Sequence, residues 1–367
     1  MTDKETDKYF MQKVINIAKN GQYTVHPNPM VGAIIVKNNK IISSGYHKKP
    51  GGPHAEQEAI KKAGSNAKNS TLYINLEPCC HYGRTPPCSD LIIQSKIRRV
   101  VVSCLDPNPL VNGKSIKQLR RSGIIVNTGT LRKEAKELNK GFFSKFINGR
   151  PHITAKFGMS IDGKISLESG ESKWITNKES RDDAQKERAL NCAIFTSSKT
   201  VLYDNPQMTV RDNNLIKKII KQPDLAVMDR NLEVPTNSKI FKDKSRLIYI
   251  FTSKGRSSKK YKSNVILVKV SSKNNLLDIN ECLEYLAKQD VNNIFLESGS
   301  RLMGSFLKDD LIDELLLYVS PKILGSTSIP FSGVEHIKKL SDKISFSISD
   351  IIVINKELKI KLEKKYV

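Results

Sequence analysis

Residues 54–88 read HAEQEAIKKAGSNAKNSTLYINLEPCCHYGRTPPC. The stretch contains His54, Cys79 and Cys88, which together offer a zinc ion three protein ligands and leave a fourth position open for water. Glu56 follows the histidine by two positions and is not needed as a ligand, so its carboxylate is free to move protons. An activated water and a free carboxylate are what hydrolytic deamination of an aromatic amine requires. The stretch therefore predicts a zinc site that catalyses hydrolysis.

The spacing of the ligands leaves alternatives open. Eight residues separate Cys79 from Cys88, whereas the usual deaminase signature has two between its cysteines. Cys80 and His81 are adjacent rival ligands, which spacing alone does not exclude. A buried cysteine often only packs, and a structural zinc module in a binding protein usually has four protein ligands. The glutamate beside the histidine and the proline before the first cysteine favour a catalytic zinc.

Length and composition are those of a two-domain globular protein. The chain has 367 residues, more than the ~250–300 at which a single core stops growing, and 38% of them are hydrophobic. The N-terminus shows no export signal, no apolar run reaches the ~18 residues needed to cross a bilayer, and the six cysteines are irregularly spaced. We therefore expect a cytoplasmic protein with reduced thiols and no membrane partner.

The formal net charge of +24 has two interpretations. Clustered lysines would neutralise the phosphates of a nucleic acid. Here the lysines are spread along the chain, without a long basic block and without interleaved aromatic residues for base stacking. We favour solvated lysines that also attract small anionic substrates, and expect no nucleic-acid partner. The alternative is a tRNA or DNA base deaminase with a C-terminal nucleic-acid-binding domain.

The first half of the chain alternates helices and strands. Apolar spacing predicts a helix around residues 10–18 that ends near Gly21, and glycine and proline positions bound the later elements. The metal ligands then fall at the N-terminal ends of two helices and just beyond a strand, and helix ends of this kind favour thiolates. The remaining predicted elements are helices over 54–63 and 88–94, and strands over 31–36, 41–46, 71–76 and 99–104.

The pattern of predicted helices and strands changes around residues 141–151, which follow a charged helix and precede a new strand. We therefore expect a domain over 1–147 and a second over 148–367. Residues 358–362 alternate strictly and predict a half-exposed strand with its lysines outward. The second domain is richer in strands, which are predicted over 152–157, 193–196, 225–228, 247–251, 265–270, 294–296 and 315–319.

Further motifs continue past the zinc stretch in both halves. They are HPNPMVG (26–32), GYH (45–47), EPCCHYGRTPPC (77–88), DPNP (106–109), SIDGK (160–164), GESKWIT (170–176), TV (200–201) with DNP (204–206), and ESGS (297–300). With these motifs the chain closely resembles the family of bifunctional riboflavin-biosynthesis proteins, in which a pyrimidine deaminase is fused to a reductase. The resemblance covers nearly the whole chain.

The resemblance implies an α/β fold with two parts: a cytidine-deaminase-like N-terminal domain, whose mixed sheet lies between helices, and a dihydrofolate-reductase-like C-terminal domain. It implies a zinc-dependent deamination of 2,5-diamino-6-(5-phosphoribosylamino)pyrimidin-4(3H)-one, with one zinc per chain. NADPH would then reduce the ribosyl side chain of 5-amino-6-(5-phosphoribosylamino)uracil to ribityl. The substrate would be a small phosphorylated pyrimidine, and the protein a homo-oligomer formed through its reductase domain.

Roles are carried over residue by residue from the same resemblance. It makes His54, Cys79 and Cys88 the zinc ligands and Glu56 the proton carrier. The other implied residues are, in the deaminase pocket, Asn28, His47 and Lys114; at NADPH, Gly158, Trp174, Thr200, Asp204, Gly299, Ser300, Arg301, Leu302, Met303, Gly304 and Ser305; at the reductase substrate, Ser172, Arg188, Met208, Arg211 and Glu297; and, near the transferred hydride, Lys156 and Asp162.

The chain departs from the family pattern at three positions. Tyr82 stands where histidine is common, Ser115 where glycine is common, and Ser298 where relatives have glycine or alanine. These departures touch substrate contacts and the expected phosphate loop, and none falls on the zinc ligands.

The reductase assignment depends more on the resemblance than the deaminase assignment does. The usual dinucleotide fingerprint, G-x-G-x-x-G after a strand, is absent, although residues 297–300 follow a strand and precede a helix whose start could hold a phosphate. Plainer interpretations remain for single residues: Trp174 in the core, Arg188 on a solvated helix face, and residues 204–206 as a turn.

Overall fold

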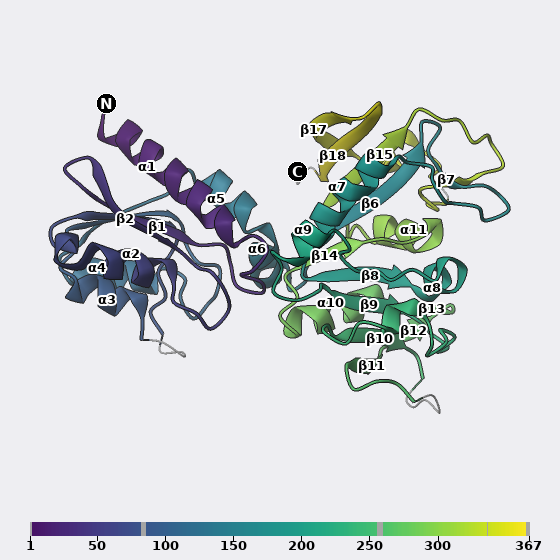
Figure 1. Cartoon of the computed structure of the whole chain (residues 1–367), viewed down its shortest axis with the longest axis horizontal. Helices are drawn as coiled ribbons and strands as arrows, with labels where there is room; N and C mark the ends of the chain where they lie inside the picture. Colours follow the sequence, from purple (N-terminus) through teal and green to yellow (C-terminus); the bar gives the residue numbers. More distant parts are fainter. Residues whose placement is uncertain (1, 82–85, 255–259, 336, 365–367) are drawn as a thin grey trace. The chain divides into compact units, whose positions relative to one another are not determined.

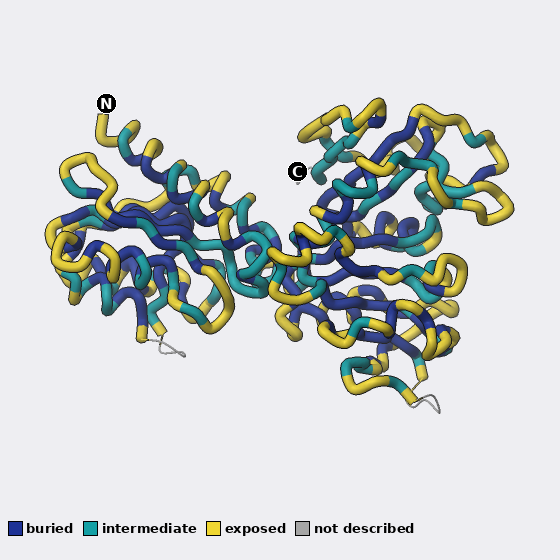
Figure 2. The backbone as a smooth tube through the Cα atoms, viewed as in Figure 1, coloured by how far each residue is buried: buried dark blue, intermediate teal, exposed yellow. Residues whose placement is uncertain are grey.

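The computed structural model describes residues 2–81, 86–254, 260–335 and 337–364. The chain divides into two compact units, Met1–Gly149 (unit 1) and Arg150–Val367 (unit 2), each built around a large β-sheet with helices (Figure 1). Buried residues concentrate on the strands of both sheets, as Figure 2 shows. Each unit therefore has a core of its own.

Unit 1 contains a five-stranded sheet of order β2-β1-β3-β4-β5. β1 pairs antiparallel with β2 and β3, whereas β3, β4 and β5 run parallel. β1, β3 and β4 are nearly continuous apolar runs, which is expected of strands covered on both faces. The strands are β1 Gly32–Lys37, β2 Lys40–Tyr46, β3 Thr71–Leu76, β4 Arg99–Cys104 and β5 Ile125–Thr128.

Helices cover both faces of this sheet. On one face α2, α3 and α4 pack against Ile35 and Leu72, and on the other α1 packs against Ile34 and Tyr73. Neighbouring strand residues point to opposite faces, so each strand contributes to both layers. The helices are α1 Asp3–Ala18, α2 Ala55–Ala63, α3 Cys88–Gln94, α4 Lys114–Arg121, α5 Arg132–Leu138 and α6 Lys140–Asn148, with short 3₁₀ turns η1 Lys19–Gly21 and η2 Gly64–Ala67.

The strands and helices predicted between residues 31 and 104 are confirmed, and their ends differ from the prediction by at most one residue. The first predicted helix is also present and is followed by a 3₁₀ turn that ends at Gly21. β5 was not predicted, because Val126 is its only buried residue and the alternation is too short to detect.

Unit 2 contains a nine-stranded sheet of order β11-β10-β9-β8-β14-β6-β15-β18-β17. In this order, each strand from β11 across the sheet to β15 runs parallel to its neighbours. At the other edge, β18 pairs antiparallel with β15, and β17 pairs antiparallel with β18. The strands are β6 His152–Ser160, β8 Ala193–Ser197, β9 Asp224–Met228, β10 Ile248–Thr252, β11 Val265–Lys269, β14 Asn293–Leu296, β15 Glu314–Ser320, β17 Phe346–Ile354 and β18 Glu357–Lys364; two small sheets pair β7 Lys164–Ser166 with β16 Ile329–Pro330, and β12 Ser272–Lys273 with β13 Leu276–Leu277.

The sheet of unit 2 is also covered on both faces. α10 and α11 pack on the face that carries Phe195 and Leu296, whereas α7 and α8 lie on the face that carries Phe295 and Ile194. The helices are α7 Lys178–Ala189, α8 Ser198–Asp204, α9 Asn213–Ile216, α10 Ile279–Lys288 and α11 Ser300–Lys308, with 3₁₀ turns η3 Lys239–Phe241 and η4 Leu340–Asp342. Within the described ranges, no helix is both long and apolar enough to span a bilayer.

The predicted strands of unit 2 are confirmed, but the expected orientation of the C-terminal lysines is wrong for Lys359. Its side chain is 14% exposed, and its ammonium group pairs with the carboxylates of Asp183 and of Glu187 (2.8 Å), both on α7. Alternation in a sequence shows that a strand has two different faces. It does not show that a helix with acidic residues covers the lysine face.

Candidate active sites

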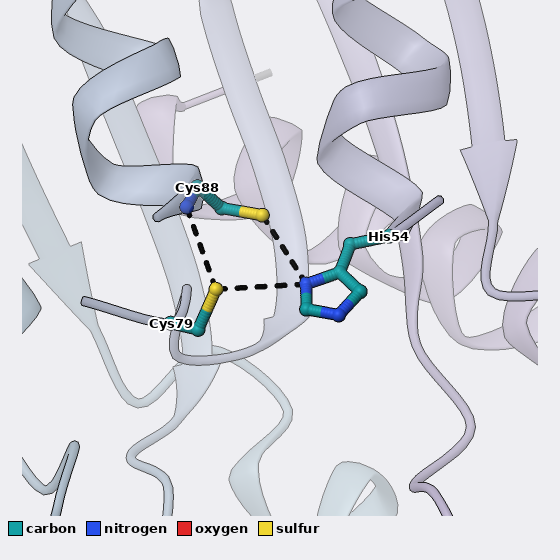
Figure 3. Close-up of side chains that lie close together, drawn as sticks. All are labelled: His54, Cys79 and Cys88. Carbon is teal, nitrogen blue, oxygen red and sulfur yellow. Dashed lines mark hydrogen bonds between the residues drawn. The ribbon is translucent and has the colours of Figure 1, made fainter. Parts of the chain in front are cut away.

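The three predicted zinc ligands meet at one end of the sheet of unit 1. β3 ends at Leu76, and Pro78, which has no N–H to donate, stops the strand pairing before Cys79. His54 immediately precedes α2, and Cys88 is the first residue of α3. Two helix starts and one strand end therefore bring the three side chains together, as the sequence predicted (Figure 3).

The donor atoms are spaced as a zinc ion requires. The Nδ1 atom of His54 lies 3.5 Å from the sulfur of Cys79 and 3.3 Å from the sulfur of Cys88, and all three donors lie within 4.8 Å of one another. Tetrahedral zinc with ordinary Zn–S and Zn–N bonds would separate such a nitrogen and sulfur by about 3.6 Å. The residues therefore fit a zinc ion with three protein ligands.

The surroundings favour the thiolate form of one cysteine. Hydrogen bonds from the Cys88 thiol and from His54 lower the pKa of Cys79, and the backbone N–H of Cys88 also points to its sulfur at 3.4 Å. The pKa of Cys88 is raised because its thiol donates to Cys79. The thiolate of Cys79, just beyond the end of β3, is the form of cysteine that binds metal.

The rival ligands lie elsewhere. The sulfur of Cys80 faces the carbonyl oxygen of Leu110 at 3.8 Å, and the side chain of His81 is exposed. Neither belongs to a group of potential metal ligands in the described part of the chain.

Glu56 lies in the first turn of α2, buried to 3% exposure beside the metal ligands. Burial raises the pKa of Glu56 to about 7, against the opposing effect of His54. Its carboxyl group also interacts with Cys88, so it sits beside the metal site without belonging to the donor set. A carboxyl group that titrates near neutral pH is suited to accept and return a proton.

Asn28 and His47 form a pair next to these residues. The His47 Nδ1 atom lies 3.0 Å from the carbonyl oxygen of Pro53, which can only accept, so Nδ1 carries the proton. The Nε2 atom must then accept from the amide nitrogen of Asn28 at 2.9 Å. Burial lowers the pKa of His47, which keeps the ring neutral. This leaves the amide oxygen of Asn28 available to a ligand, and the ring of His47 packs edge-on to that of His54.

The sequence motifs predict no role for Glu77, but the structure shows that it anchors the loop that bears Cys79. Its carboxylate accepts from the backbone N–H of Asp106 (3.2 Å) and of Gly113 (2.8 Å) and from the hydroxyl of Ser115 (2.8 Å). The serine that replaces the common glycine therefore adds a hydrogen bond. The role of Glu77 could have been suspected from the sequence, because a charged residue directly after a buried strand needs hydrogen-bond partners.

Two other deaminase residues are placed as follows. Lys114 is the exposed first residue of α4, and its charge opposes the burial that raises the pKa of the Cys80 thiol. Tyr82 lies outside the described residues.

In unit 2, five predicted residues line one pocket. Both Lys156 and Arg188 pair with Glu297: the lysine Nζ lies 3.1 Å from one carboxylate oxygen, and the arginine donates two hydrogen bonds of 2.8 and 3.0 Å. The pocket is lined by Lys156, Gly158, Arg188, Arg211 and Glu297 together with Thr176, Ser180, Arg181, Ala184, Gln185 and Tyr318. Sequence reasoning missed the second group, which comes mostly from α7.

The pocket is strongly cationic, because one carboxylate faces several cations. Burial alone would raise the pKa of Glu297, but Arg188 and Lys156 outweigh it and lower the pKa to about 2. Burial and the charge of Arg188 lower the pKa of Arg211. The unneutralised positive charge is suited to bind an anion such as a phosphate.

Side chains hold the loop that carries Arg211. The buried guanidinium of Arg246 donates to the carbonyl oxygens of Gln207 (2.9 Å) and Met208, and Arg188 donates to that of Thr209 (3.0 Å). The side chain of Met208 packs in the core below β8–β10, so only its main chain could reach a substrate. Arg246 was not singled out in the sequence, because nothing there distinguishes a buried arginine from a solvated one.

The predicted coenzyme residues lie at several places. The hydroxyl of Ser172 contacts the carboxylate of Asp204 at 3.5 Å, which joins a predicted substrate residue to a predicted coenzyme residue. Thr200 lies in the first turn of α8, capped by Ser197 at 3.3 Å. Trp174 is exposed, so it is not a core residue.

The segment 299–305 is only partly available to a ligand. Gly299 precedes α11, whose first turn has no side-chain cap. Met303 is fully buried in the core, and a Cβ added to Gly304 would lie 2.5 Å from the carbonyl oxygen of Gly333. The coenzyme contact stays a prediction for every residue of the segment, and at Met303 and Gly304 only the main chain could make it. Asp162, predicted near the hydride, accepts from the backbone N–H groups of Leu324 (3.2 Å) and Gly325 (2.9 Å).

Two family models match the chain. Residues 4–104 match the cytidine and deoxycytidylate deaminase zinc-binding region, and residues 151–354 match the RibD C-terminal domain. The first match contains the zinc donors, and the second contains the cationic pocket.

Relatives and solved structures agree over nearly the full length. Riboflavin biosynthesis protein RibD of Buchnera aphidicola is 42% identical and that of Escherichia coli 38% identical, covering 98% and 94% of this chain and 98% and 96% of theirs. A structure of Acinetobacter baumannii RibD superposes with a TM-score of 0.91 at 34% identity, covering 99% of this chain and 100% of that one.

A Thermotoga maritima structure described as a diaminohydroxyphosphoribosylaminopyrimidine deaminase/5-amino-6-(5-phosphoribosylamino)uracil reductase superposes with a TM-score of 0.87 at 32% identity, covering 99% of each chain. Together with the α/β architecture of both units, these matches confirm the predicted fold classes. The chain belongs to the RibD family of bifunctional riboflavin-biosynthesis proteins.

Proposed function

We propose that residues 1–147 deaminate 2,5-diamino-6-(5-phosphoribosylamino)pyrimidin-4(3H)-one and that residues 148–367 then reduce the ribosyl side chain of 5-amino-6-(5-phosphoribosylamino)uracil to ribityl. Membership of the family makes the chain a deaminase and a reductase with zinc and NADPH as cofactors. The observation that carries the assignment is the set of three donors at zinc spacing beside the buried carboxyl group of Glu56.

In the deaminase site, zinc held by His54, Cys79 and Cys88 would supply an activated water. Glu56 is the proton carrier, because its buried carboxyl group lies beside the donor set without belonging to it, and can accept a proton and deliver it to the departing ammonia. The amide oxygen of Asn28, held in place by His47, is free to accept a hydrogen bond from a pyrimidine N–H. The burial of Glu56 and the hydrogen bonds of Asn28 and His47 support these roles.

In the reductase site, NADPH supplies the hydride, and the protein binds and orients the reactants. Arg188 and Arg211 are the groups that pair with the substrate phosphate, because their planar forks match its oxygens. Glu297 fixes Arg188 and Lys156 in the pocket. Lys156 is then the cation available to the sugar that is reduced.

We further propose a cytoplasmic homo-oligomer that associates through unit 2 and has no nucleic-acid partner. β17 is the edge strand of the large sheet, and its apolar residues Ile348, Ile351, Ile352 and Val353 are between 45% and 69% exposed. An exposed apolar edge strand is a surface that proteins usually cover.

A gel-shift titration with tRNA should show no complex at physiological salt, and a specific complex would overturn the proposal that the protein has no nucleic-acid partner.

The proposed reactions can be tested by mass analysis of products. Incubation with the diaminopyrimidine phosphate should give a product heavier by about one mass unit, because an amino group is replaced by oxygen. Adding NADPH should give a further gain of about two mass units as the ribosyl group is reduced. A gain of two mass units with NADPH in a substrate that has not been deaminated would contradict the proposed order of the two reactions.

Replacing Glu56 by Gln should preserve one zinc per chain but lower the rate of deamination by a factor of about 10²–10⁴, because the proton carrier is lost. Zinc is measured by elemental analysis and ammonia release by a coupled assay. Reduction of supplied aminouracil phosphate should be unchanged and serves as the control. A variant that binds zinc and deaminates at the wild-type rate would show that Glu56 does not carry the proton.

Replacing Cys88 by Ser should remove the zinc and abolish deamination, because two protein ligands are too few to hold the ion. The matched control is Cys80→Ser, which changes a neighbouring thiol that lies outside the donor set and should keep its zinc. Both variants should retain the reductase activity. Loss of zinc from the Cys80 variant would instead make that residue a ligand.

Replacing Ile351 by Lys should convert the oligomer to a monomer, because a charge would be placed on the proposed contact surface. Molar mass is measured by light scattering on a sizing column. The matched control is Ile42→Lys on the edge strand β2 of unit 1, which should leave the molar mass unchanged. A wild-type protein that is monomeric at all concentrations would refute the proposed assembly.

A further inference from the structure

Trp174, the one tryptophan in the chain, has an unusual conformation and exposure. Its side chain is 66% exposed, and its backbone φ angle is +68°. Bulky residues rarely adopt this left-handed region, and they do so where the surroundings force them into it. Contacts around Trp174 must therefore maintain its backbone conformation.

Lys322, just after β15, holds the backbone at this position. Its ammonium group donates to the carbonyl oxygen of Trp174 at 2.9 Å and to that of Ile175 at 2.8 Å. Two successive carbonyls that converge on one cation fix the orientation of the peptide between them. The bend at Trp174 is thus held by a residue from a distant part of the chain.

Arg181, in the first half of α7, holds the indole itself. The guanidinium carbon lies 4.1 Å from the centroid of the indole, which is a cation–π contact. The same guanidinium donates to the carbonyl oxygen of Thr176. Since Arg181 covers one face of an indole that is still 66% exposed, the other face is open.

The loop that carries Trp174 lies next to the reductase pocket of unit 2. Arg181 and Thr176 line that pocket together with Lys156 and Gly158. Ser172, at the other end of the loop, contacts Asp204 at 3.5 Å. The loop is therefore fixed at both ends as well as at its bend.

We propose that Arg181 and Lys322 are positioning residues that fix Trp174 so that the open face of its indole stacks on an aromatic ring of NADPH. The inference rests on the proposed coenzyme contact of Trp174. A flat, fixed indole beside the pocket matches the flat nicotinamide and adenine rings of the coenzyme. Neither Arg181 nor Lys322 needs to touch the coenzyme in order to act.

Because the chain has a single tryptophan, its fluorescence reports on Trp174 alone. NADPH should quench the emission of the full-length wild-type protein in a saturable way. Either Arg181→Ala or Lys322→Met should raise the Kd from quenching and the KM for NADPH about tenfold, with kcat changed far less. Arg181→Lys and Lys322→Arg should recover part of the loss, because they keep the cation.

Controls separate this effect from misfolding. Lys178→Met removes an exposed lysine of the same helix and should leave the Kd unchanged. Deamination by unit 1 and the circular dichroism spectrum should be normal in every variant. If one variant does not fold, the other still tests the inference.

The outcomes distinguish the inference from the function on which it rests. Quenching by reduced nicotinamide mononucleotide or by 2′,5′-ADP that weakens in the Arg181→Ala and Lys322→Met variants supports the inference and identifies the stacked ring. Folded Arg181 and Lys322 variants with wild-type Kd and KM would overturn the inference and leave the contact of Trp174 intact. NADPH oxidation by the wild type without any change in tryptophan emission would overturn the contact itself, and the inference with it.

Discussion

The deaminase unit depends on one constraint: two thiol sulfurs and one imidazole nitrogen must meet at a single point that leaves a fourth position open. The parallel pairing of β3 with β4 and the starts of α2 and α3 satisfy it, because carboxyl ends of strands and helix starts meet at the same edge of the sheet. Glu77 then holds the loop of Cys79 through three hydrogen bonds. With the donors fixed, Glu56 remains available beside them as a proton carrier.

In the reductase unit the main constraint is the repulsion between several cationic side chains that line one pocket. Glu297 neutralises part of the charge by accepting from Arg188 and Lys156, and its low pKa keeps it ionised. The surplus positive charge remains for a phosphate. The buried guanidinium of Arg246 donates from its two terminal nitrogens to backbone carbonyls of the loop that carries Arg211, whereas its Nε has no hydrogen-bond partner among the described residues. Both units thus use buried polar groups to place the ligand-binding residues.

Most strands and helices of unit 1 could be predicted from the sequence, because the spacing of apolar residues and the positions of glycine and proline mark where they begin and end. The zinc ligands could be predicted because they lie within one short stretch. Partners that are distant in the chain could not be predicted. Arg181 and Lys322 look like ordinary surface residues, and Lys359 was expected outward although α7 covers it. The resemblance placed Met208 and Met303 at ligands, yet their side chains lie in the core. A motif marks a position in the chain without showing which way its side chain points.

X-ray absorption at the zinc edge of the zinc-loaded protein shows whether His54, Cys79 and Cys88 are the three protein ligands, because it reports the atoms bound to the metal. We expect two sulfur neighbours at about 2.3 Å and two nitrogen or oxygen neighbours at about 2.0–2.1 Å, one from His54 and one from solvent. Three sulfur neighbours would place Cys80 in the coordination sphere. That result would contradict the three-ligand site and the open position on which the deaminase chemistry depends.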